Sequence, residues 1–260
     1  MIKIAHVSDL HYKKDYNEVN NPFREILTLV DDPLKQLERT FENIDKNFDV
    51  VIVSGDICEY GSVEDYNIVK NFLNDYFKCP IIVTSGNHDN RRNLNMAFIG
   101  KDSDEIVFDV WKNEPLKIIS FDSSDPKYND GFITLETIKK LDEELSDGVK
   151  TVVFTHHHLL NDQFAMKRAE NSDALLECLN KYDNIVAILT GHTHHFYNGS
   201  VNDTLYITAE AMSFKVDGID GSLIGYQDSA ANIYEYEDGK LTVKKIECPD
   251  KKEELCLIKC

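Results

Sequence analysis

The sequence predicts an α/β fold in which five strands end at one polar site. Five short apolar runs, bounded by glycine and polar residues, are typical of buried strands. Segments in which apolar residues follow the helical period separate these runs, and that alternation is typical of an α/β arrangement. In open α/β sheets, ligand sites lie beyond the carboxyl ends of the strands, so the residues after the five runs are expected to converge.

Each of the five runs stops at residues that can bind a metal ion. In chain order these are Asp9 and His11, Asp56, Asn87 with His88 and Asp89, His156, and His192 with His194. All nine histidines of the chain lie in or beside these segments, whereas histidines with separate structural duties would be scattered. A glycine precedes the candidate ligand in three segments, where the missing Cβ allows a sharp turn and a close backbone approach.

The first half of the chain has three expected strands and three expected helices. A polar stretch at 12–32 separates the first strand from the first helix and is expected to form a lid or a wall of the pocket. Asp32 is the expected N-cap of that helix, with proline at its first position. The elements are strands at 2–7, 49–54 and 80–85, and helices from Pro33, at 62–77 with a capping-box start, and from Arg91.

The second half begins with a predicted β-hairpin at 105–111 and 116–121, so the sheet is expected to be mixed there. After residue 196 the pattern is entirely β. The other expected elements are helices at 134–145 and 173–181, and strands at 151–155, 185–190, 197–201, 205–209, 223–226, 231–236 and 241–246. We expect one domain over 1–248 and a charged, loosely held tail over 249–260.

The composition argues against several classes of function. A formal net charge of −18 disfavours binding to duplex nucleic acid or to an anionic membrane surface. The six cysteines show no Cys-x-x-Cys spacing and no secretory signal precedes them, so reduced thiols are expected. The first strand starts at residue 2, and no apolar run approaches the roughly 20 residues of a membrane helix. We therefore expect a cytoplasmic protein without a membrane partner, and the oligomeric state is left open.

The candidate ligands are carboxylate, imidazole and amide groups, without a thiolate. Such ligands suit Mn, Fe, Zn or Co ions better than Cu(I) or a structural cysteine–zinc site. Two cations about 3.5–4 Å apart can clamp a phosphoryl group and acidify a bound water. Asp56 is the expected bridge, because its carboxylate has two oxygens and a charge that offsets the repulsion between the cations.

Together, the five motifs resemble those of the calcineurin-like metallophosphoesterases. They occur in the order of that family over about residues 1–195, as Asp9-x-His11, Gly55-Asp56, Gly86-Asn87-His88-Asp89, His156 and Gly191-His192-x-His194. The resemblance implies a sandwich of two mixed β-sheets flanked by helices. Segments 55–61 and 86–91 are similar to the cyclic-nucleotide phosphodiesterase-like branch, and the Asp-Arg-Gly of the protein-phosphatase branch is absent.

The resemblance also implies a role for each residue of the site. One cation would be held by Asp9, His11, Asp56 and His194, and the other by Asp56, Asn87, His156 and His192. His88 would approach the substrate and the leaving group, with Asp89 orienting its ring. Among three consecutive histidines, the position directly after the strand favours His156 as the ligand, with His157 as the alternative.

The expected function is hydrolysis of a small phosphodiester, such as a cyclic nucleotide, by attack of a metal-bound hydroxide. Asn90 and Arg91 are the candidate substrate-binding residues, although Arg91 and Arg92 either contact phosphate or simply decorate a helix start. Hydrolysis of a phosphomonoester or a pyrophosphate is the alternative within the family. A non-catalytic metal-binding scaffold is the alternative of another class, but such relatives typically lose ligands that this chain retains.

Overall fold

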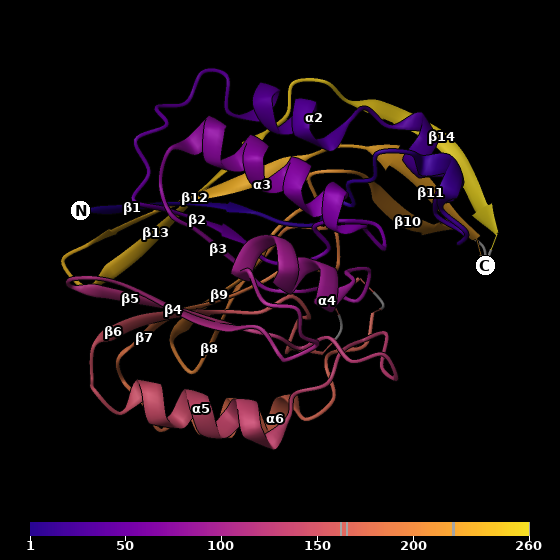
Figure 1. Cartoon of the computed structure of the whole chain (residues 1–260). Coiled ribbons are helices and arrows are strands. Elements are labelled where there is room, and N and C mark those ends of the chain that lie inside the picture. The colour runs from indigo at the N-terminus through magenta and orange to yellow at the C-terminus, as the bar shows by residue number, and fades with distance from the viewer. Residues whose placement is uncertain (162, 165, 220–221, 260) are drawn as a thin grey trace.

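The protein folds as two β-sheets packed face to face between two layers of helices (Figure 1). The computed structural model describes residues 1–161, 163–164, 166–219 and 222–259. One sheet has five strands, the other has six, and a third sheet of three strands lies at one end of the molecule. The expected sandwich of mixed sheets flanked by helices is thus confirmed.

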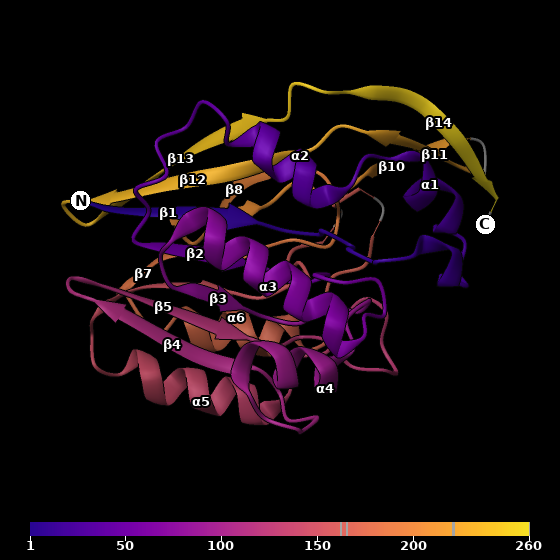
Figure 2. The same ribbon diagram turned by 45° about the horizontal axis from the view of Figure 1, so that its top comes forward.

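The five-stranded sheet supplies the first three exit loops. Across the sheet its strands are β13 (Lys240–Glu247), β12 (Ala230–Glu237), β1 (Ile2–Val7), β2 (Val50–Val53) and β3 (Ile81–Val83). The last three are parallel to one another, whereas β12 runs antiparallel to both β1 and β13. One face packs on the other sheet, and the opposite face packs on α2 (Pro33–Thr40) and α3 (Val63–Phe77). Figure 2, with the top of the molecule turned forward, shows both helices over this sheet.

Both of these helices begin as the sequence predicts. The side chain of Asp32 accepts a hydrogen bond from the N–H of Leu34, and Pro33 opens α2. Ser62 and Asp65 form a capping box at the start of α3. These caps satisfy N–H groups that the first turn of a helix leaves without an intrahelical partner, which fixes where each helix begins.

The six-stranded sheet supplies the other two exit loops. Across the sheet its strands are β4 (Phe108–Asn113), β5 (Leu116–Phe121), β6 (Lys150–Phe154), β7 (Ile185–Thr190), β9 (Thr204–Thr208) and β8 (Tyr197–Val201). The four inner strands are parallel, and β4 and β8 are antiparallel edges. Apolar residues of α5 (Leu135–Leu145) and α6 (Ser172–Leu179) cover its outer face, at the bottom of Figure 1.

The prediction of a loosely held tail from residue 249 is wrong. Lys252–Lys259 forms β14, which pairs antiparallel with β11 (Ser222–Gln227), and β11 pairs in turn with β10 (Lys215–Ile219). Ile258 is buried in a small apolar core of its own. The partner of β14 is distant in the sequence, and the charge pattern of the last residues alone does not reveal such a pairing.

The polar stretch at 12–32 contains two short helices that were not expected, η1 (Tyr16–Glu18) and α1 (Arg24–Leu29). Ile26 and Leu27 of α1 pack in the small core that also holds Ile258. The residues just before α1 line the central cavity, as described below for Asn21–Phe23. The stretch therefore forms a wall of the pocket, which is one of the two expectations for it.

The structure also bears on the helix expected from Arg91, on membrane-spanning helices and on the cysteines. The short helix expected from Arg91 is α4 (Arg91–Leu94), which continues into η2 (Asn95–Ile99). Within the described residues, no helix has the length and the apolar character needed to cross a bilayer. Cys58, Cys79, Cys178, Cys248 and Cys256 are free thiols, and Cys260 lies outside the described residues.

Candidate metal centre

The exit loops of the five strands meet at one end of the sandwich, where backbone hydrogen bonds join them. The N–H of Asp9 donates to the carbonyl of Gly55 (3.1 Å), and the N–H of His11 donates to the carbonyl of Asp56 (2.8 Å). These bonds hold the loops after β1 and β2 side by side. Among the described residues, four groups of three side chains have ligand atoms within 4.8 Å of one another. They are Asp9, His11 and His194; Asp9, Asp56 and His156; His156, His157 and His192; and His11, Glu59 and His88. The first of these is called the first cluster below, and the second of them, together with Asn87 and His192, is called the second cluster.

Several predicted ligand residues adopt an unusual backbone conformation. Positive φ angles between 47° and 73° occur at Asp9, His11, Asp56, His192 and His194. A side chain with a Cβ adopts this region at a cost of about 1–3 kcal/mol, which persists only where the surroundings impose it. We interpret these angles as the sharp turns that aim each strand end at a common point.

At Gly86 and Gly191 a glycine is required because neighbouring side-chain atoms lie too close for a Cβ, and not because of the backbone angles. A Cβ at position 86 would overlap the carboxylate of Asp56, and a Cβ at position 191 would overlap the hydroxyl of Ser8. It would also lie 2.8 Å from Oδ2 of Asp9. Any larger residue at either position would displace a predicted ligand.

The first cluster contains two imidazole lone pairs that face each other. Nδ1 of His194 donates to the carbonyl of Phe214 (2.6 Å), and Nδ1 of His11 donates to Oε2 of Glu59 (2.7 Å). Burial and the nearby His11 lower the pKa of His194 well below its usual value, so that ring is neutral. The two Nε2 atoms lie 3.1 Å apart, and the buried Oδ1 of Asp9 has no hydrogen-bond partner among the described residues. A cation between these atoms would satisfy all of them.

The second cluster also attracts positive charge. Nδ1 of His156 donates to the carbonyl of Ser54 (2.8 Å), while its Nε2 lies 3.2 Å from both Oδ1 of Asn87 and Oδ2 of Asp56. Burial lowers the pKa of His156, but attraction to Asp56 outweighs it and raises the pKa to about 9. Nε2 of His192 is buried without a partner among the described residues. The protein thus provides a second place for positive charge.

Asp56 lies between the two clusters, as a bridging ligand should. Its Oδ2 is 3.2 Å from Nε2 of His156 and 3.5 Å from Nε2 of His11. His157, the alternative ligand, has both ring nitrogens engaged, with Ser123 at 2.8 Å and the carbonyl of Asn129 at 3.1 Å. This geometry favours His156 over His157.

The donor set of both clusters therefore fits two metal ions. Oxygen and imidazole nitrogen ligands without sulfur suit Mn, Fe, Zn or Co, and two such ions supply Lewis acidity and an acidified water. The residues that would hold them are the predicted ones, Asp9, His11, Asp56, Asn87, His156, His192 and His194.

The expectation that Asp89 orients His88 is wrong. Nδ1 of His88 lies 2.9 Å from Oε1 of Glu59, whereas the carboxylate of Asp89 accepts hydrogen bonds from backbone N–H groups of Ile57 and Cys58 and from the hydroxyl of Tyr66. Asp89 thus braces the loop after β2 instead of the imidazole. Sequence reasoning missed Glu59, and its only signal was an acidic residue three positions after Asp56.

The two candidate substrate-binding residues also have structural duties. Asn90 caps α4 by accepting a hydrogen bond from the N–H of Asn93 (3.1 Å). Nε of Arg91 donates to Oδ2 of Asp122 (2.6 Å), which neutralises its charge. Arg92 is exposed and pairs with Asp102. The structure therefore favours the view that the basic pair decorates a helix start.

A cavity of about 330 Å³ opens onto both clusters. Its polar wall includes His11, Asp56, Asn87, His88, His192 and His194. Its apolar wall includes Pro22, Phe23, Met166, Phe214 and Val216. Phe23 lies in the 12–32 stretch that was expected to form a lid or a wall of the pocket, but nothing local in the sequence distinguishes Phe23 or Phe214 individually from core residues.

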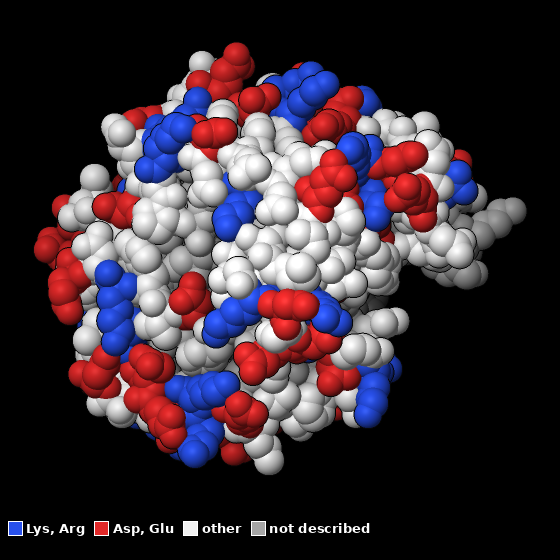
Figure 3. Space-filling model, in the orientation of Figure 1, with Lys and Arg blue, Asp and Glu red and all other residues white. Residues whose placement is uncertain are grey.

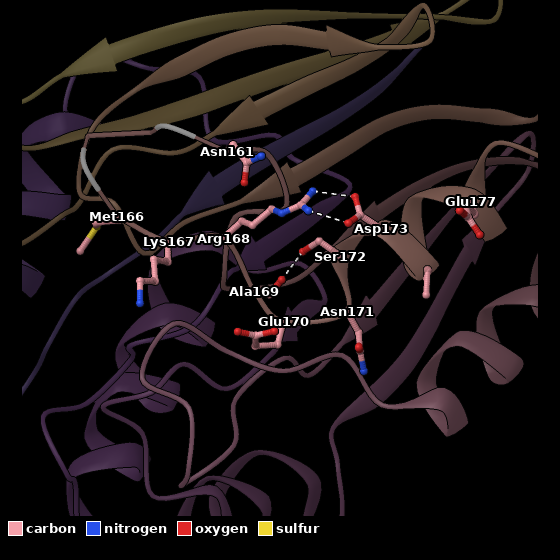
Figure 4. Close-up of a pocket in the computed structure, with 11 residues that line it drawn as sticks. Asn161, Met166, Lys167, Arg168, Ala169, Glu170, Asn171, Ser172, Asp173 and Glu177 are labelled. Carbon is pink, nitrogen blue, oxygen red and sulfur yellow. Dashed lines mark hydrogen bonds and ion pairs between the residues drawn. The ribbon is translucent and has the colours of Figure 1, made fainter.

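A larger hollow of about 740 Å³ lies beside the start of α6 (Figure 4). The guanidinium of Arg168 in its wall pairs with both carboxylate oxygens of Asp173, at 2.8 Å and 2.6 Å. Ser172 donates to the carbonyl of Ala169. These groups satisfy one another, and among the described residues no group of convergent metal-ligand atoms lies at this hollow.

The two histidines after Thr193 are expected to respond differently to replacement. His195 donates from Nε2 to the carbonyl of Val216 (3.0 Å) and stacks on Phe164, whereas Nε2 of His194 faces the first cluster. His195→Ala should therefore keep two metals per chain, and His194→Ala should lose one, as counted by elemental analysis. The reverse result would show that the ligands of this loop are misassigned.

Comparison with known proteins places this geometry in a family. The sequence profile described as Calcineurin-like phosphoesterase matches residues 2–196, which include all five exit loops. The chain belongs to the calcineurin-like phosphoesterase family. This membership confirms the predicted resemblance and the expected class, the metal-dependent phosphoric ester hydrolases.

Relatives of this calcineurin-like phosphoesterase carry phosphodiesterase names. A probable cyclic nucleotide phosphodiesterase of Vesicomyosocius okutanii is 29% identical over 156 residues, covering 57% of this chain and 63% of the relative, so the match spans less than two thirds of that relative. The glycerophosphodiester phosphodiesterase GpdQ of Enterobacter lignolyticus is 28% identical, covering 74% of this chain and 70% of the relative. These names agree with the expected cyclic-nucleotide phosphodiesterase-like branch.

The fold also recurs in solved structures. A dimetal phosphatase from Danio rerio superposes with a TM-score of 0.65 at 12% identity, covering 99% of this chain and 98% of that one. At this identity the likeness concerns the fold, and it agrees with the sandwich of two mixed sheets.

Proposed function

We propose that this calcineurin-like phosphoesterase hydrolyses a small phosphodiester with two cations bound at the two clusters. The observation that favours a diester is the charge of the cavity. Among the described residues that line it there is no lysine or arginine, while Asp56 and Asp130 contribute negative charge. A phosphomonoester carries about −1.5 to −2 charges at neutral pH, and a diester carries one fewer ionisable oxygen. Beyond the two cations, the described lining offers no positive side chain to a second ionised oxygen, so the site suits the less charged substrate.

A second cavity next to the metal centre provides space for the second substituent of a phosphodiester. It has a volume of about 630 Å³ and shares Tyr60, Asn87 and Asn129 with the cavity of the metal centre. Arg91 lies in its wall, but that guanidinium is already paired with Asp122. A phosphodiester bound at Asn87 would have one substituent directed to each side, whereas a phosphomonoester would leave one side unused.

The chain's own residues support hydrolysis as follows. Cations held at the two clusters would acidify a water and offset charge on the phosphoryl oxygens. Burial lowers the pKa of His88, but attraction to Asp56 and Glu59 outweighs it and raises the pKa to about 9, so the ring is an imidazolium. Glu59 holds its Nδ1–H, which leaves the Nε2–H as the proton that can pass to the departing oxygen. Pro22, Phe23 and Phe214 give the cavity an apolar wall beside this ring.

The partner of the chain is thus proposed to be a small phosphorylated molecule. Lysine and arginine side chains are interspersed with acidic ones over the face shown in Figure 3, and the net charge is −18. Such a surface opposes the binding of a polyanion such as duplex DNA. The cytoplasmic location stays a prediction.

A substrate panel with the Mn²⁺-loaded chain tests the proposed function. We expect kcat/KM for bis(p-nitrophenyl) phosphate to exceed that for p-nitrophenyl phosphate by more than about tenfold, or about 1.4 kcal/mol of transition-state stabilisation. Cyclic AMP and a glycerophosphodiester, assayed beside them, distinguish the two substrate classes named for the relatives. Faster hydrolysis of the monoester or of pyrophosphate would contradict the proposal, and no turnover of any ester would favour the scaffold alternative.

A further inference from the structure

Glu59 holds two histidines of the site with one buried carboxylate. Its side chain is fully buried, with Oε2 lying 2.7 Å from Nδ1 of His11 and Oε1 lying 2.9 Å from Nδ1 of His88. The backbone N–H of Glu59 donates to the carbonyl of Tyr12 (3.0 Å), which fixes the loop that carries it. Each carboxylate oxygen thus lies at hydrogen-bond distance from a ring nitrogen, and the carboxylate is the acceptor in both contacts.

The two contacts determine which nitrogen of each ring carries a proton. Because a carboxylate only accepts hydrogen bonds, His11 and His88 both have to be protonated at Nδ1. In a neutral ring the lone pair is then on Nε2. For His11 this lone pair faces the first cluster, where Nε2 of His194 lies 3.1 Å away.

Asn21 ties the pocket wall to the same carboxylate. Its Nδ2 donates to Oε1 of Glu59 (2.5 Å), and its Oδ1 accepts from the N–H of Phe23 (3.0 Å). The second contact fixes the orientation of the amide, so Nδ2 rather than Oδ1 faces Glu59. Oε1 thus receives two donors and Oε2 receives one.

We propose that Glu59 is a positioning residue that sets the tautomer of His11, holds the ring of His88 at Nδ1, and makes the first cluster competent to bind a cation. The proposal depends on the proposed function only through cation binding at that cluster. It does not depend on which residues take part in ester hydrolysis.

The asymmetry at Glu59 gives the proposal a specific test in Glu59→Gln. Glutamine has nearly the same shape, but it has one accepting oxygen and one donating NH₂. Its oxygen is expected at the Oε1 position, which faces two donors, so its NH₂ faces Nδ1 of His11. His11 then has to be protonated at Nε2, and this proton points at Nε2 of His194. A proton thereby takes the place of the cation.

We therefore expect Glu59→Gln to bind Mn²⁺ about 10–100-fold more weakly at one of its two sites, as measured by calorimetric titration with Mn²⁺ alone. The double variant Asn21→Ala with Glu59→Gln removes the donor that orients the glutamine, and it should regain part of this loss. The matched control is Glu64→Gln on the surface of α3, where the side chain is 66% exposed and pairs with Lys14. That control should bind Mn²⁺ as the unmodified chain does.

Unchanged Mn²⁺ affinity in folded Glu59→Gln would overturn the proposal. An equal loss in the single and double variants would overturn the role of Asn21. If Glu59→Gln does not fold, ¹H–¹⁵N spectra of the histidine rings in the metal-free unmodified chain decide the matter, because neutral His11 protonated at Nε2 contradicts the tautomer assignment. A chain that binds two Mn²⁺ ions in this way but hydrolyses no ester would disprove the proposed function and leave this inference intact.

Discussion

Asp56→Ala is expected to release both metal ions and to lower kcat/KM by at least about 10³-fold, which corresponds to about 4 kcal/mol. The reason is the position of one carboxylate between the two clusters, 3.5 Å from Nε2 of His11 and 3.2 Å from Nε2 of His156. Its removal takes a ligand from each proposed site and leaves the two cations to repel each other directly. Elemental analysis and kinetics on the same preparation measure both effects.

The control for this variant is Asp102→Ala, which removes an exposed carboxylate that pairs with Arg92. It should keep two metals per chain and full activity. Full activity with one metal per chain in the unmodified protein would refute the two-metal centre. Retention of both metals by Asp56→Ala would instead show that Asp56 is not the bridge.

The convergence of the site could be predicted from the sequence because it follows from the topology of the backbone. Parallel strands place their carboxyl ends at one edge of the sheet. Asp9, Asp56 and Asn87, which follow β1, β2 and β3, are therefore brought close together by the strand order. The second sheet delivers His156 and His192 by the same rule. The order and spacing of the motifs were therefore enough to predict which residues meet in the two clusters.

The partner of His88 could not be predicted in the same way. Asp89 is its neighbour in the sequence, but adjacent residues in an exit loop point in different directions. The carboxylate of Asp89 turns back to the N–H groups of Ile57 and Cys58, and Glu59 approaches His88 from another loop. Contacts between loops depend on tertiary structure, which a single sequence does not encode locally.

The same limit explains two of the differences from the expected fold. The 249–260 segment is charged, yet it forms β14 because its backbone pairs with β11 and because Ile258 is buried against residues of α1. The helices within 12–32 form next to the small core that holds Ile258. The two segments pack on each other, so each is stabilised by tertiary contacts and neither shows a strong periodic pattern of apolar residues.

The last prediction separates metal binding from proton transfer through His88. Glu59 holds this ring at Nδ1, and the ring lines the cavity without being one of the predicted metal ligands. His88→Ala is therefore expected to keep both metals and to lower kcat on an alkyl phosphodiester by about 10²–10⁴-fold, the usual range for general acid–base catalysis. The loss on bis(p-nitrophenyl) phosphate should be smaller, because a nitrophenolate departs without needing a proton.

The comparison between the two leaving groups is what makes the His88 experiment decisive. A loss that is larger for the alkyl ester identifies His88 as the proton donor. Equal losses on both esters would show that the ring acts on the phosphoryl oxygens, which are the same in both substrates. Loss of a metal ion would make His88 a ligand after all. Glu59→Gln provides an internal reference, since it is expected to weaken metal binding while retaining the His88 ring.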